Sequence, residues 1–554
     1  MNKQSANRRE DDDGLAIAMD RLSQLPQPIL HSILSLLPQK DAVQTSVLSK
    51  SWRYLWHGRF NFEFCNFWFA RKKESRSFVD KTLQRYLDQN LSLQKFLVDV
   101  SSYEVDLAAF VLLQKWIPMV IMNMDVSSLS LIFSWGTKAY PLPLVVFQSE
   151  SLVELHLTRC DFSTLKSTDN VMLKNLQTLR LHYVYITDEI FEKIISGCPL
   201  IETLNLSQCI GLKSIKLHKH HIVKNFRCFI CEQTIIEIED PHTLESLYIE
   251  NWCPDWFFPF KNMDFLHLKS LKLFRVKLPA ETFDNFSSFF PCLSELILKS
   301  CDGLKEFRLL SSSIKRLTIW SCLRHSIKAF IDTPNIVYFE FSGAHCFLPL
   351  IKFTTPSNEW KSQISLHYML KHSEKDDTSW LLKLNRLLKS LSQSHITLSL
   401  HGIMYKKLHI NDSYAGFCKP IVVEHFKLYE FLSHPDLLDP TIFNCFFWIF
   451  RPRYIHMDCY AAKKLSEFIC NLIPEKKRCY FWLQDWEELI IEVWDMKAEE
   501  WNCVQRTSLQ ALPDKQTIRF RLTWREQLSK LTYLSSKIYF SIYFMIELFR
   551  KLFG

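Results

Sequence analysis

A nine-residue pattern, L-x-x-L-x-L-x-x-C/N, recurs along the sequence at a nearly constant interval and constrains the fold more than any other feature. It is clearest in four segments: LVELHLTRC from Leu152, IETLNLSQC from Ile201, LSELILKSC from Leu293 and IKRLTIWSC from Ile314. Weaker copies begin at residues 176, 223, 244, 268 and 336, so successive copies start 21 to 25 residues apart. The alternating apolar residues predict one short strand in each copy.

This interval is that of a leucine-rich repeat, in which stacked strands bury a core that no single repeat could bury alone. Two degenerate copies, LQKFLVDVS from Leu93 and VSSLSLIFS from Val126, extend the array toward the N-terminus, with DLAAFVLLQKWI between them as a predicted helix. We therefore expect an α/β chain in which residues 93–355 form a curved solenoid of nine to eleven repeats.

The order of the spacings nearly returns after four repeats. At an offset of 92 residues, PLIETLNLSQCIGLKSIKL (199–217) aligns without a gap with PCLSELILKSCDGLKEFRL (291–309). Duplication of a four-repeat block is a hypothesis that follows from this alignment. Similarity confined to the apolar positions would argue against it.

The repeat pattern fades after about residue 355. SWLLKLNRLLKSLSQ (379–393) has the apolar spacing of a helix and HITLSLHGI is typical of a strand, so the array is expected to continue irregularly. Residues 356–500 include the aromatic-rich stretch 421–497, with AAKKLSEFICNLI as a further helix, and predict an irregular α+β cap. Residues 501–554 form an uncertain tail. Its end is expected to be an amphipathic helix, since an apolar run of nine residues cannot cross about 30 Å of hydrocarbon.

Composition favours an ordered protein of a reducing compartment. Apolar residues make up 47% and charged residues 23%, and only 10 of the 554 residues are Gly, which excludes a low-complexity chain. The net charge of +8 is spread along the chain, so nucleic-acid binding is not indicated. The polar leader 1–18, expected to be disordered, has no secretory signal, and 17 scattered cysteines favour free thiols.

The segment 19–57 carries more apolar surface than it could bury alone. Leu25, Ile29, Ile33 and Leu36 recur at helical spacing, with a second apolar stripe beside them, and Pro38 is expected to end this helix. A second helix then carries Ala42, and Ser49 is the expected N-cap of a third. Because three short helices have a small core, the surplus apolar face is expected to bind a partner protein.

This segment resembles the F-box, the adaptor-binding module of substrate receptors in Skp–cullin–F-box ubiquitin ligases. The resemblance rests on Asp20-Arg21-Leu22, Leu25-Pro26, the core ILHSILSLLP and the closing VLSKSWRYLW. With the repeats behind it, the chain is similar to plant F-box/leucine-rich-repeat proteins, some of which carry an FBD region near the C-terminus. The resemblance implies a non-catalytic, cytoplasmic or nuclear receptor that binds a Skp-type adaptor, and through it a cullin. No cofactor is implied, and the runner-up is a repeat scaffold outside a ligase.

Two sets of contact residues follow. The resemblance to the F-box implies ten adaptor contacts: Leu25, Pro26, Ile29, Leu30, Ile33, Leu34, Leu37, Val43, Leu48 and Trp52. About half of them are expected to be internal core residues instead. Side chains alternate along a strand, so the residues flanking the inward leucines face outward and predict a target-binding surface: Arg180, His182, Arg227, Phe229, Tyr248, Lys272, Phe274, Ile297, Lys299, Arg316, Thr318 and Trp320. Their basic and aromatic composition suits an acidic peptide or an anionic small molecule, although a solvated face without a ligand is an equal alternative.

Three other features have a structural explanation. The series His218, His220, His221, Cys228 and Cys231 has a shorter loop than the usual zinc-finger spacing. Its two cysteines also occupy positions of the repeat itself, which explains them without a metal. The repeated cysteines 160, 209, 301 and 322 are interpreted as turn residues that bond the neighbouring repeat. The aromatic loop NWCPDWFFPF (251–260) is expected to fold back over the solenoid, with an exposed binding surface as the alternative. No catalytic or metal-binding residue is predicted.

Overall fold

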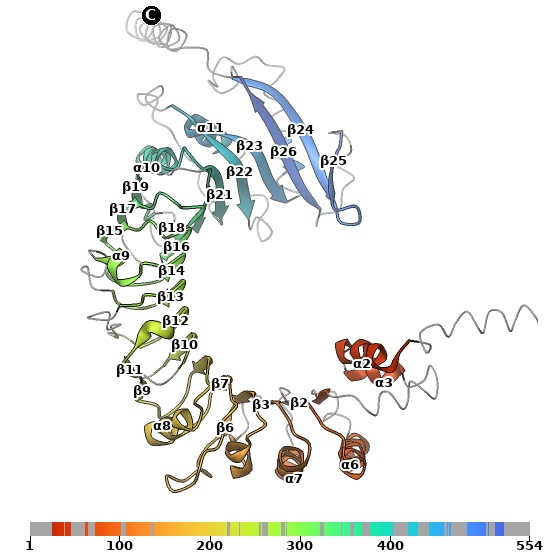
Figure 1. Ribbon diagram of the computed structural model, residues 1–554. Coiled ribbons are helices and arrows are strands. Elements are labelled where there is room, and N and C mark those ends of the chain that lie inside the picture. Colours follow the sequence, from red (N-terminus) through yellow and green to blue (C-terminus); the bar gives the residue numbers. More distant parts are fainter. Residues whose placement is uncertain are drawn as a thin grey trace, which may run out of the picture. The chain divides into compact units, whose positions relative to one another are not determined.

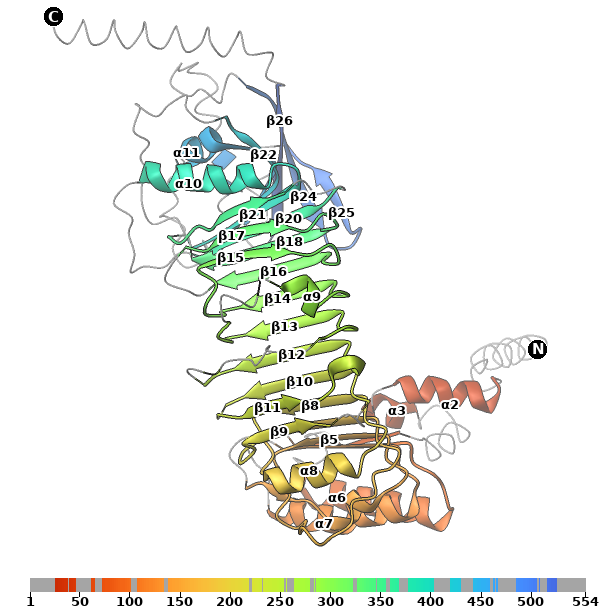
Figure 2. The ribbon, with the colours of Figure 1, turned by 60° about the vertical axis from the view of Figure 1, so that its left-hand side comes forward.

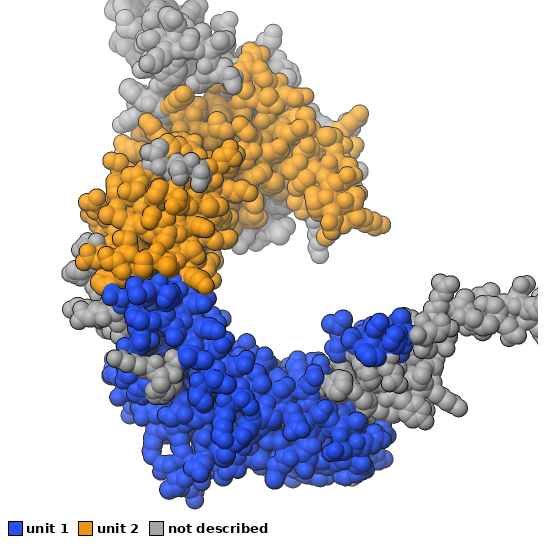
Figure 3. Space-filling model, viewed as in Figure 1, with its two compact units in different colours: residues 1–268 blue, residues 269–554 orange. Residues whose placement is uncertain are grey.

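The computed structural model divides into two compact units, residues 1–268 and 269–554 (Figure 3). The residues that the structure describes are 25–37, 39–45, 61–64, 72–100, 107–133, 138–218, 222–231, 233–253, 256, 264–278, 283, 285–321, 326–344, 346–354, 359–367, 377–402, 419–429, 442–458, 462–463, 465–466, 485–505, 508 and 516–525.

Two short helices, α2 (Gln27–Leu36) and α3 (Gln39–Thr45), open the first unit. Helix α2 follows Pro26 at its N-cap and ends two residues before Pro38, as expected from the lack of an amide hydrogen in proline. Both predicted helices are therefore present. The third predicted helix, from Ser49, and the leader 1–18 lie outside the described residues.

A ladder of parallel strands forms the main sheet of the first unit, with each strand paired to the next in sequence (Figures 1 and 2). Its strands are β1 (Asn61–Phe64), β2 (Lys95–Val100), β3 (Ser128–Phe133), β5 (Glu154–Thr158), β7 (Thr178–His182), β8 (Thr203–Ser207), β10 (Asn225–Ile230) and β12 (Ser246–Asn251). Strands β2 and β3 lie where the two degenerate copies predicted strands.

Helices and short strands complete the repeats of this unit. Three helices, which lie on one side of the ladder in Figure 1, are α6 (Lys72–Asp88), α7 (Leu107–Asn123) and α8 (Asp188–Ser196). Helix α7 is the one predicted between the first two repeat strands. The shorter elements are β4 (Tyr140–Pro141), η1 (Leu144–Gln148), β6 (Cys160–Asp161), β9 (Ser214–Leu217), β11 (Ile235–Ile238) and η2 (Pro241–Thr243). The core lies between these elements and the ladder.

The second unit continues the same pattern and then departs from it. Its parallel ladder consists of β13 (Ser270–Phe274), β14 (Glu295–Lys299), β16 (Arg316–Ser321), β18 (Tyr338–Ala344), β20 (Lys361–His367), β21 (His395–His401), β22 (Ile421–Tyr429) and β23 (Phe450–Asp458). Antiparallel strands follow: β26 (Thr517–Trp524) pairs with β23 and with β24 (Trp486–Asp495), and β24 pairs with β25 (Glu500–Cys503).

Register stacks the apolar side chains of successive strands. Leu271, Leu296 and Leu317 are paired across β13, β14 and β16, and all three are buried. A second parallel sheet of β15 (Glu306–Leu310), β17 (Lys328–Asp332) and β19 (Leu350–Phe353) completes these repeats, together with α9 (Phe286–Phe289). Apolar burial at every second residue is the main stabilising contribution to such a ladder.

The predicted irregular continuation after residue 355 is confirmed for its first elements. Helix α10 (Asp377–Ser390) and β21 lie where helical and strand patterns were expected. Helix α11 (Ile442–Ile449) contributes Phe446, whose ring packs edge-on against Phe426 of β22. Of the helix expected over 461–473, four residues are described, all helical. The helix expected at the C-terminus lies outside the described residues.

Candidate protein-interaction surfaces

The apolar side chains of α2 divide into a buried and an exposed set. Leu30 and Leu34 form a buried cluster with Ala42 of α3, and Leu25, Ile33 and Leu37 pack against it half-buried. Ile29 is 47% exposed, and Pro26 is exposed as well. The side chains of Val43, Leu48 and Trp52 lie outside the described residues. Of the ten predicted adaptor contacts, Leu30 and Leu34 are thus core residues.

Leu36 is 85% exposed, which makes it one of the two most exposed large apolar side chains of the described chain. Sequence reasoning did not include it among the adaptor contacts, although it shares a helical stripe with Ile29 and Ile33. The signal that could have found it is the position of Pro38, because a residue in the last turn of a short helix has few neighbours to cover it.

The strands of both ladders place their predicted binding residues on the outward face. Burial alternates along each strand, as in TLRLH of β7 and SLKLF of β13, where the leucines are buried and their neighbours are half-buried or exposed. In the first unit the outward positions include Arg180, His182, Arg227, Phe229 and Tyr248; in the second they include Lys272, Phe274, Ile297, Lys299, Arg316 and Trp320. Thr318 is the exception, since it is buried between its paired neighbours Ile297 and Glu340.

Carboxylates neutralise most of the cations on the outward face of the second unit. Glu295 contacts Lys272 at 2.9 Å and Arg316 at 4.0 Å. Partial burial by itself would raise the pKa of Glu295, but hydrogen bonds from Lys272 and Ser270 and the nearby positive charges lower it below its ordinary value. The face is therefore of mixed charge, which the sequence pattern did not indicate because it selected only the basic and aromatic members.

Aromatic rings hold the other cations in place. The Nζ atom of Lys299 lies 3.3 Å from the ring centroid of Trp320, whose Nε1 donates to Glu340 at 2.9 Å. In the first unit, the guanidinium of Arg227 lies 4.1 Å from the ring centroid of Tyr248. Such cation–π contacts orient a cation without removing its charge.

Histidines extend the outward face of the second unit in a way that sequence reasoning missed. His367, His401 and Tyr429 are stacked in a column, with ring centroids 4.5 and 4.8 Å apart. His425, also on β22, has its Nδ1 3.0 Å from Nε2 of His456 on β23. Burial, together with the positive charges of His425, Lys427 and Arg519, lowers the pKa of His456 to about 3, so this ring is neutral at physiological pH.

The repeated cysteines act as structural thiols. The Sγ of Cys209 donates to Leu181 O at 3.8 Å and that of Cys301 to Leu273 O at 3.4 Å, both in the neighbouring repeat. Burial raises the pKa of each of these two thiols to about 12. The predicted bond to the neighbouring repeat is confirmed for Cys209 and Cys301. It is wrong for Cys160, whose buried thiol donates to Thr158 O of its own repeat at 3.8 Å, and Cys322 lies outside the described residues.

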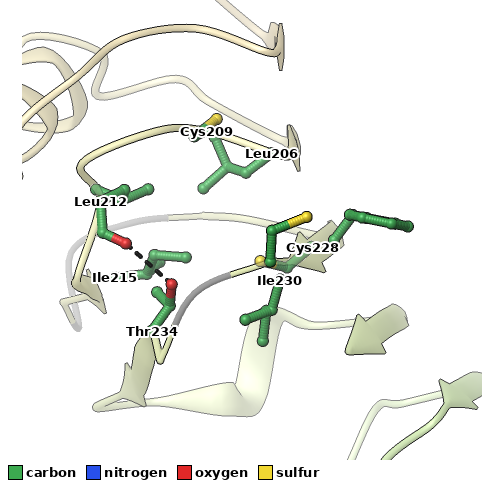
Figure 4. A pocket seen from close by; sticks show the side chains of 9 residues that line it. Leu206, Cys209, Leu212, Ile215, Cys228, Ile230 and Thr234 are labelled. Carbon is green, nitrogen blue, oxygen red and sulfur yellow. Dashed lines mark hydrogen bonds between the residues drawn. The ribbon is translucent and has the colours of Figure 1, made fainter. Parts of the chain in front are cut away.

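A small cavity in the first unit is lined by one of the repeated cysteines and by a cysteine of the histidine–cysteine series. Leu206, Cys209, Leu212, Ile215 and Cys228 line it, with Ile230 and Thr234, and Thr234 Oγ1 donates to Leu212 O across it (Figure 4). Burial raises the pKa of the Cys228 thiol far above its ordinary range. Among the described residues, which exclude His220 and His221, no group of three or more His, Cys, Asp or Glu side chains could hold a metal ion.

The aromatic loop that follows β12 is divided between both expected environments. Trp256 is buried, and its Nε1 donates to Thr234 O at 2.7 Å. Trp252 is exposed, and its Nε1 donates to Glu250 at 3.0 Å. The other aromatic residues of this loop, at 257, 258 and 260, lie outside the described residues.

Two segments of the chain match known protein families. Residues 22–63 match the F-box domain, and residues 113–245 and 237–341 match the family profile described as FBD-associated F-box protein At5g56370, LRR repeats. The resemblance to plant F-box/leucine-rich-repeat proteins is thereby confirmed. None of the described helices is long and apolar enough to cross a membrane.

Three of the similar proteins, all from Arabidopsis thaliana, show the extent of the match. F-box/LRR-repeat protein At3g59200 is 37% identical over 231 residues, 39% of this chain and 42% of that protein. F-box/FBD/LRR-repeat protein At1g66290 is 32% identical over 213 residues, 37% of this chain and 43% of that protein. F-box/LRR-repeat protein At5g41840 is 25% identical over 379 residues, 63% of this chain and 67% of that protein. The chain thus spans less than half the length of the first two.

Proposed function

We propose that this chain is a non-catalytic substrate receptor of a Skp–cullin–F-box ubiquitin ligase. The observation that carries the proposal is α2, which lies inside the F-box match and exposes Ile29 and Leu36 beside a core of Leu30 and Leu34. Exposed apolar side chains next to a complete small core are typical of a protein-binding surface. F-box/LRR proteins generally act as substrate adaptors of such ligases.

In this function the two ends of the chain have different tasks. Helices α2 and α3 dock on the Skp adaptor through the exposed set of α2 and its half-buried neighbours. The outward face of the repeat strands recruits a target protein. The receptor accelerates ubiquitin transfer by proximity, since holding a target lysine beside the thioester raises its effective concentration.

Substitutions in α2 separate docking from folding. We expect Ile29→Ala combined with Leu36→Ala to abolish co-purification of the Skp adaptor and cullin, with the circular dichroism spectrum and melting temperature unchanged, because both side chains are exposed. Leu34→Ala, at a fully buried position, is expected to lower the stability of the F-box by about 2–4 kcal/mol.

Met122→Ala is the matched control, because Met122 is an exposed apolar residue of α7 outside the F-box match. Adaptor capture that survives the double substitution would contradict docking through α2. If the unaltered chain captures neither adaptor nor cullin, the chain is a repeat scaffold that acts outside a ligase.

A further inference from the structure

The two outward faces differ in how their arginines are neutralised. In the second unit, Arg316 is within 4.0 Å of Glu295, and Arg519 and Arg521 share Glu492. In the first unit, Arg180 and Arg227 have no carboxylate within that distance among the described residues, and both side chains are exposed. The charge of these two guanidiniums is therefore available to a partner.

Strand pairing places the two arginines in one row across the ladder. Arg180 of β7 is paired with Asn205 of β8, which is paired with Arg227 of β10. Two outward carboxylates lie next to this row, and both already accept hydrogen bonds. Glu250 of β12 accepts them from Tyr248 and Trp252 at 2.7 and 3.0 Å, and Glu154 of β5 accepts one from Ser128 at 3.0 Å. Among the described residues, neither of these carboxylates forms an ion pair with Arg180 or Arg227.

The groups around this row donate hydrogen bonds or carry positive charge. Asn205 lies between the arginines and offers a side-chain amide, and Tyr248 supports the guanidinium of Arg227 from one side. His156 is paired with Arg180 on the other side of the row. Burial first, and then the charges of Arg180 and His182, lower the pKa of His156, which is consistent with a positive potential over this part of the sheet.

The spacing of the row suits an extended chain. Neighbouring strands lie about 4.8 Å apart, so Arg180 and Arg227, two strands apart, have their backbones about 10 Å from each other. In the extended polyproline II conformation, three residues of a peptide cover about 9 Å and complete one turn, so the side chains of residues i and i+3 point the same way. A peptide laid across the strands can therefore place the side chains of its residues i and i+3 over the two guanidiniums, whose planar donors match carboxylate and phosphate oxygens.

We propose that the row of Arg180, Asn205 and Arg227 binds an extended acidic segment of the target protein, with one anionic side chain over each guanidinium. The inference rests on the proposed function, because it takes the outward face as the target-binding site. It narrows that site from a general basic and aromatic face to one row of the first unit. It also assigns the target a chemistry, two anionic side chains three residues apart.

The test uses the purified full chain and nine-residue random peptides in which two positions are fixed as Asp, phosphoserine, Ser or Lys. We expect peptides with Asp or phosphoserine at a spacing of three residues to be selected over those with Ser or Lys. The Asp and phosphoserine peptides distinguish an acidic segment from a phosphorylated one. Arg180→Ala and Arg227→Ala are each expected to weaken binding of the selected peptide at least about tenfold.

Arg316→Ala is the matched control, since Arg316 lies on an outward strand face but next to Glu295; it is expected to change the affinity by less than about threefold. Equal losses in Arg180→Ala and Arg316→Ala would overturn the proposal, as would a preference for acidic peptides that does not depend on spacing or no preference at all.

Adaptor capture by the same preparations keeps the two proposals apart. A chain that captures the adaptor but shows no acidic preference would refute this inference and leave the receptor function intact. A chain that selects acidic peptides through Arg180 and Arg227 without capturing the adaptor would refute the receptor function and leave the inference intact. Unchanged melting temperatures of the exposed arginine variants exclude misfolding as the cause of any loss.

Discussion

At the scale of single residues, the eighth position of the repeat has a conformational requirement that its apolar pattern does not reveal. Five residues at this position have φ between +51° and +57°: Arg159, Tyr183, Gln208, Arg275 and Ser300. The backbone N–H of each donates to a carbonyl of the following repeat, as Ser300 N does to Trp320 O at 2.6 Å. The left-handed turn therefore links neighbouring repeats, although a side chain makes that conformation costly.

Substitutions of Ser300 test this requirement. We expect Ser300→Val to lower the free energy of unfolding by about 1–2 kcal/mol, because a β-branched side chain is poorly compatible with positive φ. Ser300→Gly is expected to leave the stability unchanged or to raise it by less than about 1 kcal/mol, since glycine relieves the strain but adds entropy to the unfolded chain. Urea titrations compare the three proteins. A loss in the glycine variant as large as that in the valine variant would refute the requirement.

Thiol reactivity tests the structural assignment of the repeated cysteines. Cys231, Cys292 and Cys503 are exposed, whereas burial raises the pKa of Cys209 and Cys301 to about 12 and leaves almost no thiolate at neutral pH. Iodoacetamide at pH 7.5 is expected to label the exposed group at least about tenfold faster, as followed by peptide mass spectrometry. Labelling of Cys209 or Cys301 at the rate of Cys231 would contradict this assignment.

At the scale of elements, a carboxylate links the two long helices of the first unit. Asp80 of α6 accepts hydrogen bonds from Lys115 Nζ at 2.7 Å and Trp116 Nε1 at 2.9 Å, both on α7. These hydrogen bonds, that from Lys115 first, lower the pKa of Asp80 below its ordinary value of 3.8. The stability that they contribute is therefore fully present above about pH 4 and is lost as the pH falls through the lowered pKa of the folded state.

Asp80→Asn is expected to lower the free energy of unfolding by about 1 kcal/mol at pH 7. The expected loss is small because solvent screens the charge of this partly exposed carboxylate. The difference from the unaltered protein should shrink as the pH falls below 4, which urea titrations at several pH values measure. Glu150→Gln, at the exposed ion pair with Lys174, is the control, with an expected change below about 0.5 kcal/mol. A deficit in Asp80→Asn that does not depend on pH would contradict the assigned linkage.

The repeat strands could be predicted from sequence because their information is local. Two inward leucines in nine residues define a strand and its buried face, and β7, β8 and β9 begin 92 residues before β13, β14 and β15, as the alignment of the two blocks indicates. Whether this offset reflects a duplication stays a hypothesis. The short strands of the second sheets, such as β17 and β19, were not predicted, since a single KAFID or LIKF has no periodic partner in sequence.

The pairing of charges could not be predicted, because it depends on lateral register. Glu295 is the first residue of β14, and Lys272 lies on the neighbouring strand β13, 23 residues earlier in the sequence. Only the register of these two strands brings the side chains together. The same holds for Arg180 and Arg227, whose shared row follows from the pairing of β7, β8 and β10. Sequence thus predicted the face but not which of its cations lack a carboxylate.

At the scale of the whole molecule, both proposed binding surfaces lie in the first unit. This unit contains the exposed α2 surface and the Arg180–Arg227 row, whereas the cations of the second unit are largely paired with glutamates and its later strands carry a neutral histidine pair. Both proposed contacts are made by exposed side chains, so we expect that each can be removed without unfolding the chain.

The most direct test of the receptor function is the mass of the complex that the intact chain forms with a purified Skp-type adaptor, measured by light scattering during size-exclusion chromatography. We expect a complex with one adaptor per chain, which is lost when Ile29→Ala and Leu36→Ala are combined and kept in Met122→Ala. If the unaltered chain elutes at its own mass beside free adaptor, the chain does not dock on the adaptor, and the assignment as a ligase receptor is wrong.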